Sequence, residues 1–251
     1  MNKYNISFLI IIIIMLYLST TENFYDFKNL PDTYKQIEDI NVSPSGKVPK
    51  IIHRICPKKK SEWHASWHLG YESWLKVFPQ PEYTHMLWFD DELEELIKSD
   101  FPWFLEIFRS YNYNIYRIDM IRPFILYKYG GIYADMDYVC YKNFYNELPD
   151  MISIPESPYK QHEFIQNSLI CSPPLQNFWL LLVEEAINNK DKLVFFATGP
   201  ALYTNMYHKY SNMINILPMN LYNPAKEKPE FNSPDVITKH YASNVWVGEG
   251  R

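Results

Sequence analysis

The feature that most constrains the fold is a change of hydrophobic periodicity at Gly130 and Gly131, in a chain of 251 residues with only seven glycines. From residue 115 to 129 the apolar residues recur at helical spacing, whereas the following segment IYADMDYV (132–139) alternates with a period of two. Glycine readily takes the left-handed conformation that commonly ends a helix, because it has no Cβ. The two glycines therefore predict a helix that turns directly into a strand.

Strand-like and helix-like patterns alternate through the preceding part of the chain as well. The segments KIIHRI (50–55) and YTHMLWF (83–89) are typical of short strands. Helical patterns occupy 58–79 and 90–108, and the second opens on acidic residues that the helix dipole favours. Strands that alternate with helices predict an α/β domain with a mainly parallel sheet flanked by helices.

An unbroken apolar run, FLIIIIIMLYL (8–18), follows Lys3 near the N-terminus. The run is short for a full membrane span, which needs about 20 apolar residues. Its length suits a cleaved signal peptide, but no A-x-A-like cleavage site follows. We expect an uncleaved signal-anchor, with a signal peptide as the alternative.

The chain is thus expected to have three parts: a signal-anchor or signal peptide (1–19), a stalk (20–47) and a folded catalytic domain (48–251). Positive charge before the apolar run places the folded domain in the lumen of the endoplasmic reticulum or Golgi, or outside the cell after cleavage. Asn41, in the sequence Asn-Val-Ser, is then a usable glycosylation site.

Charge and cysteine content exclude some classes of function. A net charge of −5 offers no overall basic surface for nucleic acid. Cys56, Cys140 and Cys171 are too few and too scattered for a disulfide scaffold or a zinc knuckle, although one bridge stays open in an oxidising lumen.

Two acids, Asp135 and Asp137, interrupt the apolar strand-like segment and would share one strand face with Tyr133. Two such charges repel each other unless a cation lies between them, and carboxylate oxygens suit Mn²⁺ or Mg²⁺, which also bind phosphate. The preceding helix carries Asp119 and Arg122, which are neighbours at a spacing of three. Arginine suits a diphosphate and aspartate accepts hydrogen bonds from hydroxyls, so together these residues predict a nucleotide-sugar site.

The segment YRIDMIRPFILYKYGGIYADMDYVC (116–140) resembles the signature of glycosyltransferase family 32, the Asp-x-Asp sugar transferases with a GT-A fold. Within that family the likeness is greatest to the inositol-phosphoceramide mannosyltransferases of fungi. VPKIIHRI (48–55), QNSLICSPPLQNFW (166–179) and ATGPALYT (197–204) resemble further blocks of the family. The resemblance implies a GT-A-like, Rossmann-related domain.

Carried over by motif, the resemblance implies that Asp135 and Asp137 hold the metal and the ribose. It implies that Asp119 and Arg122 contact the donor sugar and its phosphates. Thr198 and Gly199 form either a turn that shapes the acceptor side or a purely structural turn. The remaining candidates are Tyr133, Asn167 and Trp246 as substrate-binding residues and His240 as a third metal ligand.

Two positions depart from the family pattern. Pro123 stands where an aromatic residue is common, and a proline inside a helix costs about 3 kcal/mol or forces a kink. Cys56 stands where a tryptophan or another large residue is frequent. His64 and His68 have helical spacing, but the general-base glutamate of a zinc protease is absent, which favours surface or packing roles.

The expected function is metal-dependent transfer of a hexose to a lipid head group or glycan acceptor. The resemblance implies mannose from GDP-mannose with retention of configuration, Mn²⁺ or Mg²⁺ as cofactor, and UDP-sugars as second choice. The membrane is a partner through the N-terminal segment, and nucleic acid is not. Two alternatives stay open: a non-catalytic nucleotide-sugar or glycan-binding protein, and a haloacid-type phosphatase, whose Asp-x-Asp lies near the first strand instead.

Overall fold

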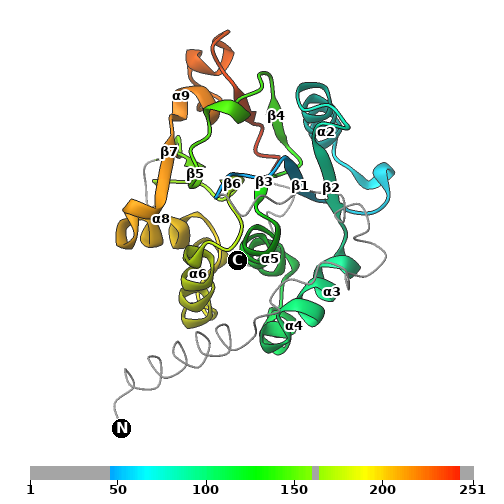
Figure 1. Ribbon diagram of the computed structural model, residues 1–251, viewed down its shortest axis with the longest axis vertical. Helices are drawn as coiled ribbons and strands as arrows, with labels where there is room; N and C mark the ends of the chain where they lie inside the picture. Colours follow the sequence, from blue (N-terminus) through cyan, green and yellow to red (C-terminus); the bar gives the residue numbers. More distant parts are fainter. Residues whose placement is uncertain (1–45, 160–163, 244–251) are drawn as a thin grey trace. The chain divides into compact units, whose positions relative to one another are not determined.

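A computed structural model describes residues 46–159 and 164–243, and Figure 1 shows their arrangement. The apolar N-terminal run, nearly all of the expected stalk, Asn41 and Trp246 lie outside these ranges. Within the described ranges, no helix is both long enough and apolar enough to cross a membrane.

Six strands form the central sheet, in the order β2-β1-β3-β6-β5-β7. Strand β1 runs parallel to both β2 and β3, β5 runs parallel to β7, and β6 is antiparallel to β3 and β5. The expected α/β domain with a mainly parallel sheet is therefore confirmed. The strands are β1 (Ile51–Ile55), β2 (Thr84–Trp88), β3 (Gly131–Ala134), β5 (Ile152–Pro155), β6 (Leu169–Ser172) and β7 (Ile214–Leu217).

Helices lie on both sides of the sheet, with α5, α6 and α8 on one side in Figure 1 and α2 and α9 on the other. The segment 90–108, expected to form one or two helices, forms two, because α3 ends at Asp100 and a short 3₁₀ turn (Pro102–Phe104) precedes α4. The helices are α2 (Ala65–Val77), α3 (Asp90–Asp100), α4 (Leu105–Ser110), α5 (Asn114–Tyr129), α6 (Asn177–Asn188), α7 (Val194–Ala197), α8 (Pro200–Lys209) and α9 (Met219–Tyr222).

A second, two-stranded sheet pairs β4 (Tyr138–Cys140) with β8 (Thr238–His240) in antiparallel register. Tyr138 lies opposite His240 in this pairing. The C-terminal part of the described chain thus returns to the segment that immediately follows the two acids.

The predicted turn from helix to strand is confirmed at Gly130 and Gly131. Their φ angles are 60° and 96°, and the Gly130 N–H donates to the carbonyl of Leu126 at 2.9 Å. A Cβ on Gly131 would lie 2.6 Å from the carbonyl oxygen of Ile51, so the close approach of β1 also demands glycine. The turn therefore fixes where α5 stands relative to the sheet.

Helix α5 is the central helix of the domain. Thirteen of its sixteen residues are buried, so its charged side chains must find partners within the protein. Two of these buried charged residues are Asp119 and Arg122.

Candidate functional site: an acidic turn beside a buried ion-pair cluster

The two acids of the Asp-x-Asp sequence lie in a β-turn, and the predicted continuous strand with both acids on one face is wrong. Strand β3 ends at Ala134, opposite Leu169, where its antiparallel partner β6 begins. The N–H of Tyr138 then donates to the carbonyl of Asp135 at 2.9 Å and closes a turn of four residues. The turn resembled a strand in the sequence because Met136, within the turn, is buried like Ala134 and Tyr138 in the adjoining strands.

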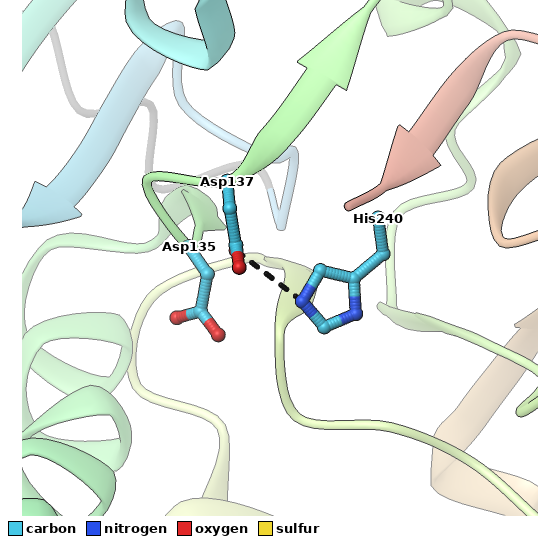
Figure 2. Close-up of side chains that lie close together, drawn as sticks. All are labelled: Asp135, Asp137 and His240. Carbon is cyan, nitrogen blue, oxygen red and sulfur yellow. Dashed lines mark ion pairs between the residues drawn. The ribbon is translucent and has the colours of Figure 1, made fainter. Parts of the chain in front are cut away.

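Asp135, Asp137 and His240 form a group that fits a divalent cation (Figure 2). One ligand atom from each residue lies within 4.8 Å of the others. The His240 ring stacks on Tyr138 with 5.0 Å between centroids, and its Nε2 lies 3.3 Å from Asp137 Oδ1. Two carboxylates and an imidazole are a donor set that Mn²⁺ accepts, and the oxygen donors also suit Mg²⁺.

Asp137 is held by the C-terminal segment of the described chain. The backbone N–H of Ser243 donates to Asp137 Oδ2 at 2.6 Å, and the N–H of Tyr241 donates to the Asp137 carbonyl at 3.0 Å. Burial alone would raise the pKa of Asp137, but His240 and the Ser243 amide outweigh burial and hold this pKa below its usual range. Asp137 is therefore ionised at neutral pH, as a metal ligand must be.

Arg122 links the acidic turn to helix α5. Its Nη1 lies 2.7 Å from Asp119 Oδ1 and donates to the carbonyl of Asn167 at 3.1 Å, while its Nη2 lies 3.0 Å from Asp135 Oδ1. The side chains of Arg122 and Asp119 are only 5% and 7% exposed. Burial opposes the charge on Arg122, but Asp135, Tyr133 and Asp119 outweigh it and raise its pKa, so the guanidinium stays charged.

Asp119 collects donors from three separate parts of the chain. Besides Arg122, Asn167 Nδ2 donates to Asp119 Oδ1 and Thr198 Oγ1 donates to Asp119 Oδ2, both at 3.2 Å. Burial raises the pKa of Asp119 to about 6, although the charge of Arg122 opposes that rise. The structure thus brings Asp119, Arg122, Asn167 and Thr198 together.

Tyr133 and Gly199 also border this cluster. The Tyr133 hydroxyl donates to Asp135 Oδ1 at 2.6 Å. Among the described residues, the donors to the Asp135 carboxylate therefore converge on Oδ1, which leaves Oδ2 for a cation. Gly199 forms the turn between Thr198 and α8, where a Cβ would meet the backbone of Val194 and Phe195 at 3.1 Å.

The departures from the family pattern are accommodated within the fold. Helix α5 continues through Pro123 to Tyr129, and proline has no N–H to donate to the Asp119 carbonyl four residues earlier. Cys56 is buried against Trp63 and Met136. The three cysteines are buried free thiols, so the structure contains no bridge between them.

The two histidines at helical spacing have the structural roles that the sequence favoured. His64 caps α2 by accepting a hydrogen bond from the Ser66 N–H, and the His68 ring packs on Trp63 at 5.4 Å between centroids.

Two residues that complete the site, Ser243 and Arg54, were not among the candidates found in the sequence. Ser243 reaches Asp137 only because β8 pairs with β4, and its own hydroxyl accepts a hydrogen bond from Trp67 Nε1 at 3.2 Å. Arg54 on β1 is buried next to the acidic turn. In the sequence, the only indication of a special role was a charged residue inside an apolar strand.

Residues 64–158 match a protein family described as "Glycosyltransferase sugar-binding region containing DXD motif". The buried Asp–Arg pair and the acidic turn both lie within this range. This range contains Asp119, Arg122, Asp135 and Asp137, so this part of the chain matches a glycosyltransferase sugar-binding region with a DXD motif, as the sequence resemblance predicted.

Named relatives make the comparison more specific. The chain is 31% identical over 207 residues to mannosyl phosphorylinositol ceramide synthase CSH1 of Saccharomyces cerevisiae, with 78% of this chain and 53% of the relative covered. It is 41% identical over 115 residues to inositol phosphoceramide mannosyltransferase 3 of Schizosaccharomyces pombe, which covers 46% of this chain and 31% of the relative. The chain thus spans about half the length of the first of these relatives, and less of the second.

Among solved structures, the chain is similar to one described as PaToxG Glycosyltransferase, with a TM-score of 0.48 and 18% identity. The match covers 72% of this chain and 73% of the other.

Proposed function

We propose that this chain is a metal-dependent glycosyltransferase of GT-A type that transfers mannose from a nucleotide-diphosphate sugar, GDP-mannose in particular. The observation that carries the proposal is the contact between two groups of residues. Arg122 joins the cation-binding group at Asp135 to the hydroxyl-accepting group at Asp119. A nucleotide sugar has a diphosphate and a hydroxyl-rich ring side by side, and this arrangement matches both.

Asp135, Asp137 and His240 would hold Mn²⁺ or Mg²⁺. When bound, such a cation neutralises the negative charge that grows on the departing nucleoside diphosphate. The low pKa of Asp137 keeps that carboxylate available over the physiological pH range.

Asp119 would position the transferred sugar. Thr198 is the hydrogen-bond donor to its Oδ2, and a carboxylate oxygen has room for a second donor such as a sugar hydroxyl. Asn167 and Arg122 hold the other oxygen and fix the orientation of the carboxylate. An oriented sugar ring places its anomeric carbon toward the acceptor, which is catalysis by positioning.

Arg122 would serve the phosphates through its charge. Its guanidinium is already bonded to two carboxylates, and their fixed geometry keeps the positive charge next to the cation-binding group. A charge that is pre-arranged in a buried site needs no reorganisation when the diphosphate arrives or departs.

The acceptor that we propose is the head group of an inositol-containing sphingolipid, with a glycan as the second choice. The names of the yeast relatives support the lipid. We further propose transfer with retention of configuration and an N-terminal signal-anchor that places the domain in the lumen of the endoplasmic reticulum or Golgi. The family resemblance supports the first, and the apolar run 8–18 supports the second.

A panel of nucleotide sugars tests the proposal on the full-length chain. Nucleotide release is measured for GDP-mannose, other GDP-sugars and UDP-sugars, each with and without Mn²⁺. We expect Mn²⁺-dependent release from GDP-mannose that is lost in Asp137→Asn and kept in Asp150→Asn, which neutralises an exposed acid. Donor binding without turnover would identify a non-catalytic binding protein, and neither binding nor release from any donor would reject the proposal.

A further inference from the structure

Arg54 is a buried cation directly beneath the acidic turn. It lies on β1, its residue is only 1% exposed, and among the described residues no carboxylate lies within ion-pair distance of it. In the parallel pairing of β1 with β3, Ile52 is opposite Ile132 and His53 is opposite Tyr133. Arg54 is therefore the next residue along, where β3 ends and the turn begins.

The guanidinium of Arg54 contacts four backbone carbonyls. Its Nη1 donates to the carbonyls of Asp135 and Met136 at 3.4 and 3.3 Å, and its Nη2 donates to those of Tyr138 and Gly70 at 3.3 and 3.4 Å. Three of these carbonyls belong to the turn that carries the two acids. The planar fork of arginine suits such a set of acceptors, which a single ammonium group cannot match.

Helix α2 supports the same turn from the other side. Trp74 Nε1 donates to the Tyr138 carbonyl at 2.8 Å, and the Arg54 guanidinium carbon lies 5.3 Å from the centre of the Trp74 ring. A Cβ on Gly70 would lie 2.1 Å from the Met136 carbonyl oxygen, so only glycine allows α2 this close. Arg54 thus fills the space between β1, α2 and the turn.

Placing a guanidinium in the interior without a carboxylate is costly, because the charge loses its hydration. Burial lowers the pKa of Arg54 to about 10, which still leaves the side chain charged at neutral pH. The hydrogen bonds to the turn, together with the nearby charges of Asp135 and Asp137, offset part of this cost.

We propose that Arg54 is a positioning residue that fixes the Asp135–Tyr138 turn and thereby sets the affinity of the site for its divalent cation. The inference rests on the proposed function in one respect, namely that Asp135 and Asp137 are metal ligands. Residues that orient metal ligands typically change metal affinity by about 10- to 100-fold when they are replaced.

Two roles of Arg54 predict opposite results. If its positive charge were all that mattered, removing it would strengthen cation binding, because like charges repel. If the fork positions the turn, removing it weakens binding, because the two carboxylates are no longer held together. Arg54→Met removes both charge and fork, whereas Arg54→Lys keeps the charge and loses the fork.

The test is a Mn²⁺ titration of the full-length chain, followed by electron paramagnetic resonance of the free ion. We expect Kd to rise by about 10- to 100-fold in Arg54→Met and also to rise in Arg54→Lys. The matched control is Lys128→Met, which removes another buried cation, one paired with Asp100 at 2.6 Å. This control should lower the melting temperature and leave Kd for Mn²⁺ unchanged.

Gly70→Ala disturbs the same turn but keeps the Arg54 side chain, for which the Gly70 carbonyl is one of four acceptors, and it should also weaken Mn²⁺ binding. It and Arg54→Lys keep the proposal testable if Arg54→Met does not fold. Wild-type affinity or tighter binding in the Arg54 variants overturns the inference, while the proposed function stands.

Hydrogen exchange of the metal-free chain separates the inference from the proposed function. The peptide that contains Asp135–Tyr138 should exchange faster in Arg54→Met than in Lys128→Met. If the wild-type chain binds no Mn²⁺, the metal-dependent function fails, and this comparison alone decides the role of Arg54. Equal exchange rates in the two variants would overturn it.

Discussion

His53 offers a quantitative test of how the domain holds the turn between α5 and β3. Its Nδ1 lies 3.1 Å from Trp88 Nε1, and its Nε2 lies 2.9 Å from the carbonyl oxygen of Gly130. The indole N–H can only donate, so Nδ1 accepts and Nε2 carries the proton that is donated to Gly130. The hydrogen bonds therefore require a neutral ring, and burial lowers the pKa of His53 to about 3.

The sign of the pH dependence follows from the two states of the chain. In the unfolded chain His53 has a pKa near 6.5, so below that pH the unfolded state binds a proton that the folded state excludes. The contribution of His53 to stability is complete above pH 6.5 and is lost as the pH falls toward 3. Between pH 7 and pH 5 the free energy of unfolding falls by about 2 kcal/mol, because the folded-state pKa lies below this interval and the unfolded-state pKa lies within it.

The measurement is the free energy of unfolding in urea at pH 7 and pH 5, for the wild type and for His53→Gln. Glutamine has a donor and an acceptor but does not titrate, and comparing the two proteins cancels other titrating groups such as Asp119. We expect the wild type to lose about 2 kcal/mol more than the variant over this interval. His68→Gln, at an exposed position, should behave like the wild type. An equal loss in wild type and His53→Gln would show that the ring is not held neutral.

Two further predictions concern the cluster and the turn. Because the pKa of Asp119 is raised to about 6, its carboxylate is ionised above that pH and protonated below it. We therefore expect kcat/KM for the donor to fall about tenfold per pH unit below pH 6. A pH profile that stays flat to pH 5 would show that Asp119 has no role in the mechanism. Gly131→Ala should lower the free energy of unfolding by at least about 1–2 kcal/mol, since φ is positive and the new Cβ would lie 2.6 Å from the Ile51 carbonyl oxygen. Wild-type stability in denaturant unfolding would contradict the close packing of β1 against the turn.

Local features of the fold were predictable because single residues record them. The pair Gly130–Gly131 marks a backbone conformation that other residues resist, and it correctly placed the end of α5 and the start of β3. The spacing of three between Asp119 and Arg122 correctly predicted neighbours on one helix, which the structure joins at 2.7 Å. Asn167 and Thr198 were candidates within segments that resemble family blocks, but the sequence did not indicate that both would donate to Asp119.

The details of the acidic turn were not predictable, because they depend on long-range pairing. Apolar alternation cannot distinguish a strand from a buried turn. The Asp135 N–H still donates to the Ser168 carbonyl at 2.8 Å, but the Tyr138 N–H then closes the turn on the Asp135 carbonyl at 2.9 Å. Ser243 approaches Asp137 through the pairing of β4 with β8. The role of Arg54 was hidden because its partners are backbone carbonyls, which a sequence does not reveal.

The proposed function depends on a divalent cation that is held by Asp135, Asp137 and His240 and that in turn binds the diphosphate of the donor. The most direct measurement is calorimetric titration of GDP into the full-length chain, with and without Mn²⁺, for the wild type and Asp137→Asn. We expect GDP to bind the wild type only when Mn²⁺ is present, and we expect no GDP binding in Asp137→Asn with or without Mn²⁺. GDP binding of equal strength without Mn²⁺, or in Asp137→Asn, would contradict it.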